Sequence, residues 1–178
     1  DIRRGQQAWL SAGGQQLGSV WGHGSYLAPD WSADWLHREA LALRSIWSKD
    51  EFGQSFEDLS VGQQGGLNAR LKSGNTYDAA TGAITLSPAR AQAVQQVARH
   101  YTDLFGDAPS LDKLREQYAM RPGSLTDAAD LKALPAFIFW SAWSAATDRP
   151  AKTDLSYTSN WPHEPLVDNT PPASAGIW

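Results

Sequence analysis

Apolar positions along the chain recur mostly at the three- and four-residue spacing of an α-helix. The pattern is clearest after Ser87 and Pro88, a capping hydroxyl followed by a proline suited to a first helical position. It predicts a helix that continues to Gly106, with one apolar face made of Ala91, Val94, Ala98, Tyr101 and Phe105. We expect this face to pack into the core.

The same periodicity predicts five further helices. They cover about residues 3–12, 32–48, 61–72, 111–118 and a last stretch that begins near Thr126. Ser32 is the expected N-cap of the second, and Ser60 with Gln63 has the spacing of a capping box before the third. Pro135 is expected to kink the last helix or to mark a new start.

Two segments depart from the helical pattern. NTYDAATGAITL, residues 75–86, alternates weakly around a turn and predicts a small β-hairpin. From residue 148 onward, prolines separate scattered apolar residues, which predicts an extended strap laid over a surface. The expected class is therefore mainly α, with a helical domain over residues 1–147 and an extended tail over 148–178.

Composition limits the possible partners and chemistry. A chain of 178 residues, 42% of them hydrophobic, is long enough for one domain with a core. Its formal charge of −4 and the absence of Lys and Arg clusters argue against nucleic acid and anionic lipid as partners. The absence of cysteine excludes disulfides, thiolate metal sites, a cysteine nucleophile and covalent attachment of a c-type haem.

The ends of the chain suggest that it is a piece of a larger protein. It starts at Asp1 without an initiator Met, and apolar residues return at 175–178 after a polar stretch. The first ten residues do not have the pattern of a signal peptide, and no apolar run approaches the roughly 20 residues that span a bilayer.

Residues that could carry out catalysis are scattered. No two of the four histidines (His23, His37, His100 and His163) have the spacing of metal ligands on one helical turn, so a zinc site is not expected. Paired carboxylates would have to come from Asp30, Asp34, Glu39 and Glu164, and the sequence cannot bring these together. Motifs of nucleophilic, phosphate-binding and dinucleotide-binding sites are missing, so we expect no catalytic residues.

Nine tryptophans are the most unusual feature of the composition. Their amphipathic rings favour interfaces, and packing in the core is the alternative for each of them. If they are exposed, they would suit a secreted carbohydrate-binding module, which would use them as stacking platforms.

Several idiosyncratic segments carry a resemblance to a known family. GQQAWLSAGGQQLGSVWGHGSYLAPDWSADWLHRE, FIFWSAW and TSNWPHEPLVDN together resemble the hydrophilic amino-terminal region of quinol-dependent nitric oxide reductases. GHGSYLAP is also similar to a Gly-Glu-Gly-Ala-Tyr-x-Ala-Pro segment in the cytochrome c subunit of the related two-subunit enzymes. The resemblance extends over nearly the whole chain and implies a cytochrome-c-like helical domain.

The resemblance also implies that this domain has lost its haem. Gly14, Leu17 and Gly18 stand where that subunit has its two cysteines and its haem-ligating histidine. Met120, in AMRPGSL, matches the second axial ligand and is expected to serve as a flexible core residue. Bulky residues such as Trp21 are expected to fill the vacated cavity, because a haem-sized void would be costly.

A non-catalytic role follows from the resemblance. The chain would cap the periplasmic face of a catalytic membrane part that reduces 2 NO to N₂O and holds haem b, non-haem iron and calcium. Tyr26 would offer its backbone carbonyl to that calcium. Trp31, Trp35, Trp161 and His163 are expected to contact the catalytic part or the headgroup region of the membrane.

Overall fold

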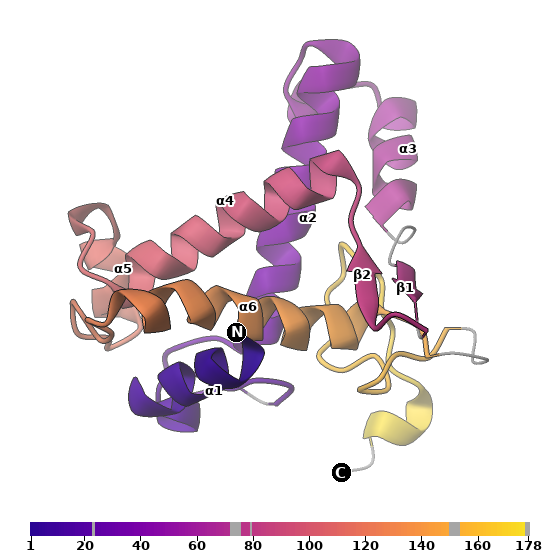
Figure 1. The fold of residues 1–178 in the computed structure, drawn as a ribbon. Helices are drawn as coiled ribbons and strands as arrows, with labels where there is room; N and C mark the ends of the chain where they lie inside the picture. The colour runs from indigo at the N-terminus through magenta and orange to yellow at the C-terminus, as the bar shows by residue number, and fades with distance from the viewer. Residues whose placement is uncertain (23, 72–75, 79, 150–153, 177–178) are drawn as a thin grey trace.

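The computed structural model describes residues 1–22, 24–71, 76–78, 80–149 and 154–176 (Figure 1). Within these ranges the chain forms six α-helices and one hairpin: α1 (Ile2–Ser11), α2 (Trp31–Phe52), α3 (Val61–Leu71), β1 (Thr76–Asp78), β2 (Ala83–Thr85), α4 (Pro88–Phe105), α5 (Asp112–Gln117) and α6 (Ala128–Ala146). The predicted mainly α class with a small hairpin is confirmed. In the described part, no helix combines the length and apolar character needed to cross a bilayer.

The core lies where α2, α4 and α6 cross, with α1 packed along α6 (Figure 1). Gly5 allows α1 to approach closely, because a Cβ there would lie 2.3 Å from the carbonyl oxygen of Ala133 in α6. A second apolar cluster fills the space between α2 and α3, where Leu43 and Trp47 pack with Leu67.

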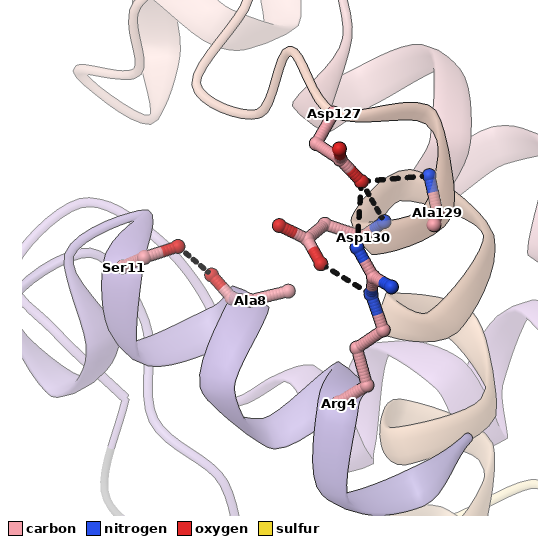
Figure 2. Close-up of polar contacts among 6 residues, drawn as sticks. All are labelled: Arg4, Ala8, Ser11, Asp127, Ala129 and Asp130. Atoms are coloured by element: carbon pink, nitrogen blue, oxygen red, sulfur yellow. Dashed lines mark hydrogen bonds and ion pairs between the residues drawn. The ribbon is translucent and has the colours of Figure 1, made fainter.

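An exposed ion-pair network links α1 to the start of α6, as Figure 2 shows. Arg4 donates from Nη2 to Asp127 at 2.8 Å and from Nε to Asp130 at 2.6 Å. Asp127 is also the N-cap of α6 and accepts from the backbone N–H groups of Ala129 and Asp130. These N–H groups, helped by Arg4, lower the pKa of Asp127.

Helix α2 begins one residue earlier than predicted, because its N-cap is Asp30. The Asp30 carboxylate accepts hydrogen bonds from the backbone N–H groups of Ser32 and Ala33, at 2.9 and 3.1 Å. The prediction of Ser32 as N-cap is wrong: this residue is fully buried, and its hydroxyl lies 3.2 Å from that of Ser141 in α6. Helix α2 also extends past residue 48, to a left-handed C-cap at Gly53.

The capping predictions for α3 and α4 are confirmed. Ser60 and Gln63 bond reciprocally before α3, and the Ser87 hydroxyl accepts from the Arg90 backbone N–H in α4. Tyr101 and Phe105 of the predicted α4 face are buried. Nearer the start of the helix the buried apolar positions are Ala93 and Val97, whereas Ala91, Val94 and Ala98 are only partly buried.

Pro135 lies inside α6 without starting a new helix. Proline cannot donate a hydrogen bond to the carbonyl four residues earlier, which is that of Leu131. The Thr102 hydroxyl of α4 reaches this carbonyl at 3.5 Å, a weak hydrogen bond that compensates in part. The neighbouring helix therefore helps α6 to continue.

The hairpin follows the predicted pattern, with Tyr77 opposite Ile84 in an antiparallel pair. Tyr77 packs on Trp143 of α6, with ring centroids 5.7 Å apart. Residues 72–75 and 79 lie outside the described residues; they include the end of the helix predicted over 61–72 and two positions of the predicted hairpin.

The tail after residue 148 follows a series of turns, in contrast to the predicted extended path. Two buried asparagines hold these turns. Asn169 donates to the carbonyl oxygens of Ala145 and Pro162, and Asn160 accepts from the Ser156 backbone N–H. Asparagine side chains stabilise turns in this way by replacing backbone partners. Residues 150–153, 177 and 178 lie outside the described part.

Candidate functional site

Gly14, Leu17 and Gly18, which the sequence resemblance aligns with a haem attachment site, lie on one turn after α1. Gly14 begins a 3₁₀-helix, Gly14–Gln16, whose C-cap is Leu17, and the Gly18 N–H donates to the Gly14 carbonyl oxygen at 3.2 Å. The indole of Trp9 donates to the Gly18 carbonyl oxygen at 3.1 Å. The turn is thus fixed by hydrogen bonds, with none of its three side chains able to bind iron.

Met120 lies across an open groove from this turn. The groove has a volume of about 500 Å³, with Gly13 and Leu17 on one wall and residues 119–124 on the other. Met120 itself is buried and belongs to the main core cluster. The structure therefore brings Leu17 and Met120, which are 103 positions apart in the sequence, to the same groove.

Trp31 occupies the space beside Gly18. A Cβ built on Gly18 would lie 2.5 Å from two atoms of the Trp31 indole, which is closer than real Cβ contacts occur. The Trp31 ring is 0% exposed and meets Tyr101, Phe105 and Tyr118 edge-on, at centroid distances of 5.5 to 6.0 Å. No side chain larger than hydrogen fits at Gly18 while Trp31 is in this position.

The prediction that Trp31 and Trp35 contact a partner is wrong, since both are fully buried. Trp35 stacks on Tyr101 at 5.4 Å and donates from its indole to Glu39 at 2.8 Å. These rings are large and apolar, and the crossing of α2 with α4 removes them from water.

Trp21, which was expected to help fill the vacated cavity, is not the ring that a Cβ at Gly18 would meet. It is 36% exposed, packs edge-on against Trp140, and donates from its indole to the Ser141 carbonyl oxygen at 2.7 Å. Trp21 therefore packs on the outside of α6, and Trp31 is the ring that lies beside Gly18.

The loop between residues 19 and 30 is organised by Asp30. One carboxylate oxygen caps α2, and the other accepts from the Ser19 hydroxyl at 2.7 Å and from the Gly22 N–H at 2.8 Å. Tyr26 is fully exposed in this loop. His23, one of the histidines considered as a metal ligand, lies outside the described residues.

Two candidate interface residues of the tail are at the surface. Trp161 is 36% exposed, and its indole donates to the Gly22 carbonyl oxygen at 3.1 Å, so it is attached to the loop that carries Tyr26. His163, two residues later, is exposed. A groove of about 390 Å³ beside this loop is lined by Leu17, Tyr26 and Tyr118, among others.

The four candidate carboxylates have separate partners. Besides Asp30, which caps α2, they form contacts between Asp34 and Arg38 (2.7 Å), Glu39 and Arg90 (2.9 Å), and Glu164 and His37 (3.1 Å). The His37 side chain is half exposed, whereas Glu39 is buried. Over the described ranges, no three His, Cys, Asp or Glu side chains converge as metal ligands would.

Burial changes the protonation of the polar groups near Asp34. Burial, reinforced by the positive charge of Arg38, lowers the pKa of His100 to about 4. Burial and the hydrogen-bonded Asp34 carboxylate, at 2.7 Å, raise the pKa of Tyr101 well above its ordinary value. His100 and Tyr101 are therefore both neutral at pH 7.

A comparison with protein families identifies the relatives of this domain. The family of the cytochrome c-like domain of NorB, a nitric oxide reductase polypeptide, matches residues 1–163. The chain belongs to this family. A search among curated proteins gave no significant match.

This result confirms the predicted cytochrome c-like domain of a nitric oxide reductase, in which the domain accompanies the catalytic part of NorB. It also disfavours the alternative of a carbohydrate-binding module. The structure agrees, because most of the described tryptophans are buried in the core and so offer no ring face to a sugar, as for Trp9, Trp31, Trp35, Trp47 and Trp143.

Proposed function

We propose that the chain is a haem-less, non-catalytic cap on the catalytic membrane part of a quinol-dependent nitric oxide reductase. The observation that carries this proposal is the contact between Trp31 and Gly18. Gly18 stands at the position of the haem-ligating histidine, and the indole beside it leaves no room for a side chain. The absence of cysteine removes covalent attachment as well.

Electron delivery gives a reason for this loss. An enzyme that is reduced by a soluble cytochrome needs a haem near its outer surface to receive the electron. An enzyme that oxidises a membrane quinol admits electrons within the bilayer, so that a relay haem outside it is dispensable. The buried Met120 then helps to keep the shape of the domain, and the intact fold provides the surface that docks on the catalytic part.

The exposed residues around the 19–30 loop support a docking role at the periplasmic face. Tyr26, Trp161 and His163 are accessible, and the indole of Trp161 is bonded to the loop. In the complete enzyme, the Tyr26 carbonyl would supply one oxygen ligand to a calcium ion, while the catalytic part supplies the others together with haem b and non-haem iron.

The isolated chain is therefore expected to bind neither haem nor calcium in stoichiometric amounts. Haem lacks a ligand pair, and one carbonyl is too few for a calcium ion that takes six to eight oxygens. The measurements are an absorption spectrum after addition of haemin and a calorimetric titration with calcium. A one-to-one Soret band that disappears in Met120→Leu, or tight one-to-one calcium binding, would contradict the proposal.

The complete reductase is expected to consume NO with a reduced quinol and to show little turnover with reduced cytochrome c. Initial rates with an NO electrode, at equal concentrations of the two donors, measure this difference. Equal or faster turnover with the cytochrome would mean that electrons enter through the outer domain and would exclude the proposed donor.

A further inference from the structure

Four aromatic rings follow one another in contact from the surface into the core. Tyr118 meets Trp31 at a centroid distance of 5.9 Å, and Trp31 meets Tyr101 at 6.0 Å. Tyr101 then stacks on Trp35 at 5.4 Å, with the two ring planes 10° apart. The last three of these rings are 0% exposed. Tyr118 is partly exposed and lines the groove of about 390 Å³ beside the 19–30 loop, so this aromatic row leads from the groove into the core.

Tyrosine and tryptophan are the side chains that a one-electron oxidant would attack in this protein. The sequence has no cysteine and a single methionine, and these are the residue types that oxidants commonly modify. The methionine, Met120, is buried. Electrons pass readily between aromatic rings that touch, because each step is short. Removal of an electron from Tyr118 can therefore be followed by electron transfer from Trp31, and then from Tyr101 or Trp35.

Proton acceptors at the inner end of the aromatic row provide a second, independent observation. An oxidised phenol or indole is a strong acid, and loss of its proton to a neighbouring base traps the radical. The Tyr101 hydroxyl donates to Asp34 Oδ2 at 2.7 Å. The Trp35 indole donates to Glu39 Oε2 at 2.8 Å. The Trp31 indole N–H is buried and has no hydrogen-bond partner among the described residues, so this ring can relay an electron but cannot lose its proton there.

We propose that Tyr118 and Trp31 relay a one-electron oxidation from the groove to Tyr101, which holds it as a neutral tyrosyl radical. One electron passes outward along the rings to an oxidant in the groove, and the phenolic proton of Tyr101 moves to the Asp34 carboxylate. The oxidant is a small radical such as nitrogen dioxide, the oxidation product of NO, which takes up the electron and becomes nitrite. Tyr101 is preferred over Trp35 because a phenol that loses its proton is oxidised more easily than an indole. Burial of Tyr101 keeps the radical away from other molecules.

Oxidation of the chain by flash-generated ruthenium(III) tris-bipyridine, followed by freezing and electron paramagnetic resonance, tests this proposal. We expect a long-lived tyrosyl radical, identified by the change in its signal when ring-deuterated tyrosine is incorporated. Tyr101→Phe keeps the ring but removes the hydroxyl, and is expected to abolish this signal. The matched control is Tyr157→Phe, which is expected to leave it unchanged. Tyr157 also stacks on a tryptophan, Trp143, at 5.6 Å, but it is 41% exposed, and no carboxylate accepts from its hydroxyl in the described part of the chain.

Two further variants test the entry of the oxidation and the proton transfer. Tyr118→Phe, at the groove, is expected to slow the appearance of the radical, because phenylalanine is not oxidised under these conditions. Asp34→Asn keeps an acceptor oxygen for the Tyr101 hydroxyl but does not take up its proton, so the yield of the radical is expected to fall. The proposal is overturned if the signal persists in Tyr101→Phe, if Tyr157→Phe lowers it as much, or if Asp34→Asn leaves its yield unchanged. Because the readout is a radical within the chain itself, failure here does not affect the proposed capping role.

Discussion

Replacing Trp31 with alanine is expected to lower the free energy of unfolding by about 3 to 5 kcal/mol. The ring is fully buried and lies against Gly18, Tyr101 and Phe105, from separate parts of the chain. These neighbours cannot all collapse into the space that the indole leaves, so much of the cavity would persist. Urea unfolding followed by circular dichroism measures the loss.

Gly18→Ala tests the same contact from the other side. The added methyl group would overlap the Trp31 ring, and such overpacking costs about 1 to 3 kcal/mol. Gly66→Ala in α3 is the matched control, because no atom lies within 4 Å of its added Cβ and alanine favours a helix. If the two alanine variants are equally stable, Trp31 does not confine Gly18. The double variant Gly18→Ala/Trp31→Ala should lose less than the sum of the single losses.

Arg90→Met is expected to destabilise the fold by about 3 to 5 kcal/mol at neutral pH, because it leaves the buried Glu39 carboxylate without its cation. Burial already raises the pKa of Glu39, and Arg90 opposes that rise. Without Arg90 the folded-state pKa rises further above the unfolded value. The penalty is therefore fully present at high pH and shrinks as the pH falls through this raised pKa and Glu39 takes up a proton.

Urea unfolding of Arg90→Met at pH 7.5 and at pH 5 measures this dependence. Arg99→Met, on the exposed side of the same helix, is the control and is expected to change stability by less than about 0.5 kcal/mol. A second variant, Glu39→Gln/Arg90→Met, keeps an acceptor for the Trp35 indole and should recover part of the loss. A penalty that stays the same at both pH values would show that Glu39 is not the charged group responsible.

Local signals explain why most helices could be predicted from the sequence. Ser60 with Gln63 and Ser87 with Pro88 act within a few residues of the helix starts that they determine, so no distant contact is needed to interpret them. Asp30 acts locally too, but Ser32 was predicted as the cap, and the sequence alone did not show that Ser32 would be buried against α6.

The parts of the candidate site that were not predicted depend on contacts between distant segments. Trp31 was expected at an interface, and only the crossing of the helices places its ring in the core beside Gly18. The turns of the tail depend on Asn169 reaching Ala145, which follows from the way the chain returns to the end of α6.

The hydrogen bond from the Trp161 indole to the Gly22 carbonyl oxygen joins residues 139 positions apart. This hydrogen bond connects the 19–30 loop to the tail, so that most of the polypeptide lies between the two residues it joins. A force applied to the tail would therefore be transmitted through this hydrogen bond to the loop that carries Tyr26, without passing through the helical core. The domain therefore contains a short mechanical linkage between its C-terminal segment and the loop that carries the exposed Tyr26.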